Sequence, residues 1–141
     1  MDTKIVVSVI SALALIVAPA FSFYWTRRKE REAEWPKQKR EQYRELLEAI
    51  SSTVGTDATP EGQLRFARAC NTIGLIASQS VLKALWQFQD ATAKSNPNRS
   101  LEQHDRCLNQ LLLAIRVDLG VSPKDDPSTF QARLWASGVD K

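Results

Sequence analysis

Residues 5–25 read IVVSVISALALIVAPAFSFYW, an apolar run without a single charged residue. As an α-helix these 21 residues, rising about 1.5 Å each, reach roughly 31 Å, which is enough to cross the hydrocarbon core of a bilayer. Four cations follow directly, Arg27, Arg28, Lys29 and Arg31. The run therefore predicts one transmembrane helix, with the rest of the chain held at a membrane surface.

A cleaved signal peptide is the alternative interpretation, because Ala18-Pro19-Ala20 has the small-x-small form of a signal-peptidase site. The apolar run, however, continues past Ala20 through aromatic residues to Trp25, and aromatic residues are typical of headgroup depth. The basic cluster would also fall just behind the cleavage point, where positive charge hinders translocation. We therefore predict a retained anchor.

The distribution of Lys and Arg around the run predicts the topology. Only Lys4 precedes it, whereas four cations follow it, and positively charged flanks stay in the cytoplasm. We expect an inner-membrane protein with its N-terminus outside and its C-terminal domain in the cytoplasm. The residues expected at the membrane interface, with lipid as a partner, are Trp25, Arg27, Arg28 and Lys29.

Small residues recur along the run at steps of 3, 4 and 4, at Ser11, Ala14, Ala18 and Ser22. Such a stripe allows two membrane helices to approach closely, and it is also a common feature of ordinary spans. It predicts either a homo-oligomer interface within the membrane or no interface at all.

The length, charge and cysteine content limit the kind of domain that can follow the apolar run. The chain has 141 residues, and we divide it into an anchor with a basic juxtamembrane helix, 1–35, and one helical domain, 36–141. The net charge of +3 is too small to indicate nucleic acid, and much of the basic excess lies beside the span. Cys70 and Cys107 have no CxxC spacing or neighbouring histidine, so we expect buried free thiols, no metal and no cofactor.

Helical periodicity covers nearly the whole chain, and strand signals are almost absent. The predicted fold is all-α, one transmembrane helix followed by a bundle of four to five helices. Trp35-Pro36 is expected to break or kink the first helix, because proline lacks the N–H. The predicted helices of the domain are 37–54, 61–77, 79–94, 101–119 and 128–137, with 61–94 as one kinked helix the alternative to two.

The strongest helix signals lie between residues 100 and 120. Residues 100–103 form a capping-box pattern with Ser100 as the cap, and Gly120 is placed to end the helix. The spacing of its apolar residues predicts that Leu108, Leu111 and Ile115 face the core. In 37–54 the corresponding positions are Tyr43, Leu46, Leu47, Ile50 and Val54.

Three short motifs carry a resemblance to known proteins. Residues 39–47 read KREQYRELL, residues 78–85 read SQSVLKAL, and residues 114–120 read AIRVDLG. With the N-terminal span, this layout resembles a widespread group of small bacterial membrane proteins, and the resemblance implies a single-pass protein with a cytoplasmic helical domain. Within the last motif Arg116 and Asp118 are two apart and do not face each other, so each would have to pair with another element.

A second resemblance rests on the only histidine. Arg99 and His104 are separated by four residues, and Arg-x4–6-His is the signature of HEPN-type ribonucleases, which are all-helical. There the arginine would stabilise phosphorane charge while the histidine moves a proton. Chance also explains the spacing, and His104 lies at or beside the apolar stripe of its helix. This position favours a packed or cap-proximal histidine over catalysis and over a pH- or ligand-sensing role.

These observations lead to two hypotheses. The first is a membrane-tethered interaction or assembly module, homo-oligomeric and without enzymatic activity, whose protein partner the sequence does not identify. The alternative is an antiviral-defence effector, either a HEPN-like ribonuclease or an oligomeric pore similar to the small membrane proteins of some RNA-targeting CRISPR systems. Arg99 and His104 buried apart would favour the module, and their convergence in one cleft would favour the nuclease.

Overall fold

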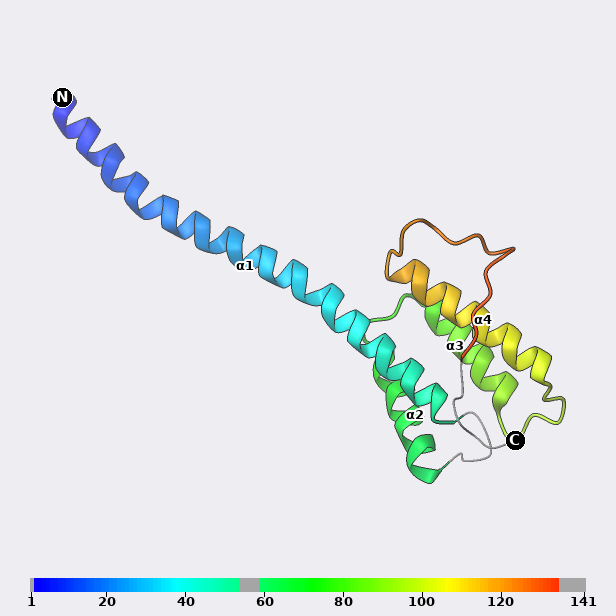
Figure 1. Cartoon of the computed structure of the whole chain (residues 1–141). Helices are drawn as coiled ribbons and strands as arrows, with labels where there is room; N and C mark the ends of the chain where they lie inside the picture. The colour runs from blue at the N-terminus through cyan, green and yellow to red at the C-terminus, as the bar shows by residue number, and fades with distance from the viewer. Residues whose placement is uncertain (1, 54–58, 135–141) are drawn as a thin grey trace. The chain divides into compact units, whose positions relative to one another are not determined.

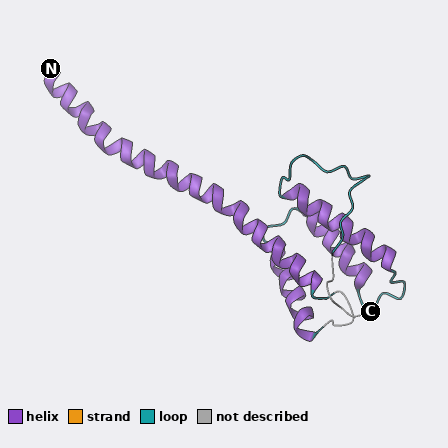
Figure 2. Ribbon diagram, viewed as in Figure 1, coloured by secondary structure: helices purple, strands orange, loops and turns teal. Residues whose placement is uncertain are grey.

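The computed structural model describes residues 2–53 and 59–134. In these two ranges the chain forms four α-helices and no strand, which confirms the all-α class (Figures 1 and 2). The helices are α1 (Thr3–Ser51), α2 (Pro60–Ile73), α3 (Gln79–Thr92) and α4 (Leu101–Asp118). The chain divides into two compact units, Met1–Gln38 and Lys39–Lys141, and each is described by itself.

The first unit consists of the N-terminal part of α1. Every residue from Asp2 to Gln38 is exposed, and the helix is long and apolar enough to be a candidate membrane span. Its aromatic end is ordered by local contacts. The rings of Phe21 and Trp25 stack at 5.7 Å, and the Arg27 guanidinium lies 4.8 Å from the centre of the Phe23 ring.

Of the break or kink predicted at Trp35-Pro36, the break is wrong, because α1 continues through Pro36 to Ser51. Proline removes one backbone hydrogen bond, to the carbonyl four residues earlier. That loss falls on an exposed stretch where water can satisfy the carbonyl, among residues of high helix propensity such as Glu, Ala, Lys and Gln. The Arg28 Nε donates to the Glu32 carboxylate, four residues later in the helix, at 3.0 Å, and this bond stabilises the turn just before Pro36. The predicted end at Gly55 lies outside the described residues.

The second unit has one hydrophobic core to which all four helices contribute. The core residues of α1 are Tyr43, Leu46, Ala49 and Ile50, and α2 adds Ala69 and Ile73. The helices α3 and α4 pack side by side (Figure 1). They contribute Val81, Ala84, Leu85 and Phe88 from α3, and Leu108, Leu111 and Ile115 from α4. The predicted inward face of the helix after Ser100 is therefore confirmed.

Helix ends follow local sequence where a capping residue is present. The hydroxyl of Ser100 accepts from the Gln103 N–H at 3.1 Å, so the predicted cap of α4 is confirmed. Gly120, at φ +67°, ends the helix in a Schellman motif, in which the Val121 N–H bonds the Arg116 carbonyl at 3.0 Å. The two helices predicted between 61 and 94 are separate, and α2 ends four residues early, directly before Gly74.

The predicted helix over 128–137 is wrong for its described part. Asp126 caps a turn that includes Ser128, and residues 130–134 are not helical. The reason is a long-range contact, because the Asn109 side chain on α4 donates to the Phe130 carbonyl at 2.9 Å and accepts from the Ala132 N–H at 2.7 Å. These bonds satisfy backbone groups that a helix would have paired internally. Residues 135–137 lie outside the described part.

The two cysteines are free thiols, as predicted, but each is half-buried rather than buried. Cys70 and Cys107 border the core without entering it. Burial raises the pKa of the Cys70 thiol, which keeps it protonated and unreactive at neutral pH.

Candidate functional site

The carboxylate of Asp118, at the C-terminal end of α4, bonds groups from two other helices of the second unit. Its Oδ2 accepts a bond from the Lys39 Nζ at 2.8 Å and one from the Tyr43 hydroxyl, both on α1. The same oxygen accepts from the Ser78 backbone N–H at 3.3 Å. Ser78 is the N-cap residue of α3, so one carboxylate oxygen joins three helices. We refer to Lys39, Tyr43, Ser78 and Asp118 as the Asp118 cluster.

The cluster is largely shielded from water. The side chains of Lys39 and Asp118 are 16% and 11% exposed, and Tyr43 is buried. Burial by itself disfavours the Asp118 carboxylate, but the bonds from Lys39, Tyr43 and the Ser78 N–H outweigh it, so the pKa of Asp118 lies below its usual value. Burial, and then the bond to Asp118, raise the pKa of Tyr43. Tyr43 is therefore a neutral donor to an ionised acceptor across the neutral pH range.

The Asp118 cluster unites the three motifs quoted for the family resemblance. Lys39 and Tyr43 come from the first, Ser78 from the second and Asp118 from the third. As expected from their spacing, Arg116 and Asp118 pair with different elements. The Arg116 guanidinium binds Asp125 through two bonds of 2.6 and 3.0 Å and lies 5.6 Å from the centre of the Phe130 ring. The motifs were visible in the sequence, but their meeting at one oxygen was not.

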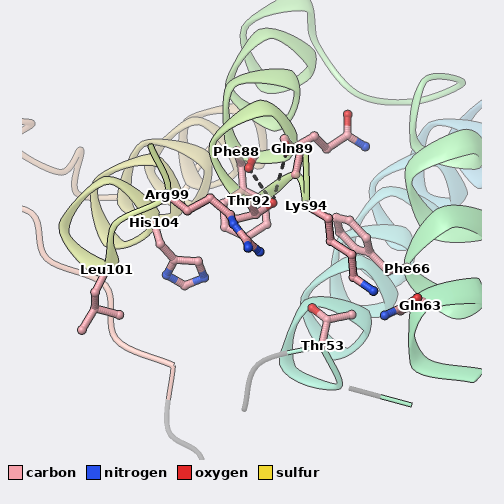
Figure 3. A pocket seen from close by; sticks show the side chains of 11 residues that line it. Thr53, Gln63, Phe66, Phe88, Gln89, Thr92, Lys94, Arg99, Leu101 and His104 are labelled. Atoms are coloured by element: carbon pink, nitrogen blue, oxygen red, sulfur yellow. Dashed lines mark hydrogen bonds between the residues drawn. The ribbon is translucent and has the colours of Figure 1, made fainter. Parts of the chain in front are cut away.

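The second unit also has a cavity of about 570 Å³ that is lined by both Arg99 and His104 and by no residue of the Asp118 cluster. Figure 3 shows the Arg99 guanidinium and the His104 imidazole directed into the same hollow, with Lys94 and Phe66 across from them. Arg99 belongs to the turn between α3 and α4, and His104 to the first turns of α4. The two residues therefore converge on one cavity.

His104 is a packed residue at the cavity wall. Its ring lies 5.4 Å from the Phe88 ring, centre to centre, and its Nδ1 lies 3.0 Å from the carboxylate of its neighbour Asp105. The side chain is 23% exposed, so it is neither a fully buried core residue nor a free surface one. His104 therefore packs against Phe88, as a structural histidine would, and also reaches the cavity, as a residue that acts on a ligand would.

The remaining predicted site residues lie in the first unit. Ser11, Ala14, Ala18 and Ser22 are exposed on α1, as are Trp25, Arg27, Arg28 and Lys29. Their exposure leaves them available to lipid or to another helix, and their roles stay predictions. In the ranges 2–53 and 59–134, no three His, Cys, Asp or Glu side chains gather as they would around a metal ion.

Comparison of the chain with protein-family models, with curated proteins and with solved structures finds no match.

Proposed function

We propose that the chain is a single-pass inner-membrane protein whose cytoplasmic helical domain is a homo-oligomeric interaction or assembly module without enzymatic activity. One observation carries the proposal. The helix α1 includes both the candidate span and core residues of the domain, among them Tyr43, Leu46 and Ile50. The C-terminal part of the helix that carries the candidate span is therefore also part of the domain core, which supports a module tethered to the membrane through α1.

The chemistry of the Asp118 cluster supports a structural role. Its donors and its acceptor satisfy one another, and no buried side-chain nitrogen or oxygen of the described residues lacks a partner. A general acid or base needs a pKa near the working pH, whereas the pKa of Asp118 is lowered and that of Tyr43 is raised. Both shifts move the pKa values away from neutral pH, so neither group is suited to proton transfer there.

The topology is tested by fusing two reporters, in separate strains, after Lys141. An enzyme that is active only in the periplasm is expected to be inactive, and a fluorescent protein that matures only in the cytoplasm is expected to fluoresce. The reason is that the four cations follow the span and keep the C-terminal side in the cytoplasm. Changing Arg27, Arg28, Lys29 and Arg31 to Gln should reverse part of the population. Periplasmic activity of the unaltered chain, or a mature N-terminus at Phe21, would contradict the proposal.

Oligomerisation is tested on the full-length protein in detergent, by the mass of the protein component in light scattering. The unaltered chain is expected to be an oligomer, and Ala14→Ile with Ala18→Ile should shift it toward the monomer by preventing close helix approach. Ala12→Ile is the matched control, because residue 12 lies about 200° from residue 14 around the helix. The predicted interface would be contradicted if the unaltered protein is a monomer. It would also be contradicted if Ala12→Ile shifts the oligomer as far as the double variant does.

A ribonuclease is the second candidate, and the convergence of Arg99 and His104 on one cavity supports it. Packing of His104 against Phe88 and its contact with Asp105 support the module instead. The test is whether the purified protein cleaves RNA and whether His104→Ala abolishes cleavage while the melting temperature stays unchanged. Both results together would favour the antiviral-defence effector over the assembly module.

A further inference from the structure

The described residues that line the cavity with Arg99 and His104 carry an excess of positive charge. Lys94 and Arg99 both line it, and none of the described lining residues carries a carboxylate. Within the described ranges neither cation has an acidic side chain at ion-pair distance, in contrast to Arg65 and Arg116, which are each bound by acids. Two cations that are directed into one hollow and have no acidic partner among the described residues favour an anionic ligand.

The wall of the same cavity is aromatic. Phe66 and Phe88 meet edge to face at 6.4 Å, and the His104 ring packs on Phe88. Phe66 is half-buried, so part of its ring is available to a ligand. Aromatic rings stack on flat ligand rings, and the amide of Gln63 adds a group that can both donate and accept hydrogen bonds. A simple inorganic anion would leave this wall unused.

The size of the cavity fits a small organic ligand. The cavity volume of about 570 Å³ lies within the roughly 300–1,000 Å³ of sites that hold small organic ligands. Two cations that line the cavity, an aromatic wall and an adjacent amide together match a phosphate joined to a planar, hydrogen-bonding base. We propose that this cavity binds a nucleoside phosphate, with Lys94 and Arg99 on the phosphate and Phe66 against the base. This site goes beyond the membrane role and does not require it.

The test is equilibrium binding of AMP, GMP, CMP and UMP to the full-length protein in detergent, by isothermal titration calorimetry. At least one nucleotide is expected to bind with a Kd below about 1 mM, and Arg99→Gln or Lys94→Gln should weaken it about tenfold or more, as expected for a lost charge-assisted bond. Arg106→Gln is the matched control, because Arg106 is an exposed arginine of α4, paired with Glu102, that does not line the cavity. That variant should change the Kd by less than about twofold.

The ligand class is tested by two further comparisons. Phe66→Leu keeps the site apolar but removes the ring, so it should weaken the nucleotide and leave the binding of inorganic phosphate unchanged. Melting temperatures establish that each variant is folded. The proposal is overturned if no nucleotide binds below about 1 mM, if Arg106→Gln has the same effect as Arg99→Gln, or if inorganic phosphate binds as tightly as every nucleotide. It is also overturned if single-stranded RNA binds more tightly than the mononucleotides and is cleaved, since the cavity is then a ribonuclease site.

Discussion

Leu111→Ala is expected to lower the free energy of unfolding of the helical domain by about 2–5 kcal/mol, the range for removing a leucine side chain from a packed core. Leu111 is fully buried on α4, in the core cluster that also contains Leu46, Ile73 and Leu85. Those core residues belong to the three other helices, so the substitution leaves a cavity in the core that all four helices share. A small domain is stable by about 5–15 kcal/mol, and the loss would be a large part of that.

The measurement is urea unfolding of a fragment that begins at Pro36, or thermal unfolding of the full-length protein in detergent. Val117→Ala is the matched control, because Val117 lies on the same helix but is 68% exposed. It should change the free energy of unfolding by less than about 0.5 kcal/mol. Similar effects of the two substitutions would mean that the inward face of α4 has been assigned incorrectly.

Asp118→Ala is expected to lower the free energy of unfolding by about 3 kcal/mol, although the side chain lies at the end of its helix. The substitution leaves the Lys39 ammonium, the Tyr43 hydroxyl and the Ser78 N–H without their common acceptor. Lys39 is only 16% exposed, so water replaces its partner incompletely. Asp90→Ala is the control, because Asp90 is an exposed carboxylate on α3.

Two measurements separate this loss from a general effect of charge. Lys39→Met in the Asp118→Ala background should recover part of the stability, because it removes the unpaired cation and keeps the apolar stem. The pKa of Asp118 is lowered in the folded state, so its contribution is complete above the unfolded value of about 3.9 and disappears as the pH falls through the folded value. The stability difference between the unaltered chain and Asp118→Ala should therefore shrink below about pH 3.9. A difference that stays constant down to pH 2 would contradict this assignment.

The prediction of the site from sequence was less complete than that of the core. The spacing of Arg116 and Asp118 predicts that each pairs with another element, but it does not identify Lys39, Tyr43 and Ser78 as the partners of Asp118. Arg99 and His104 were selected by their spacing, whereas Lys94 and Phe66, which complete the cavity, carried no signal of their own. Their relation depends on how α2, α3 and α4 pack, and no periodicity along one helix contains that information.

The sequence by itself determined the features that depend on neighbours along the chain. The apolar run before Trp25, the Ser100 cap, the Gly120 end of α4 and the inward face with Leu111 all follow from local geometry and helical periodicity. Tertiary structure decided the rest. The segment after Asp126 is not helical over 130–134 because Asn109, about twenty residues earlier, bonds its backbone. The Asp118 carboxylate finds its partners 40 and 75 residues away, at Ser78 and Tyr43, because only the packed helices bring donors so distant in sequence to one oxygen.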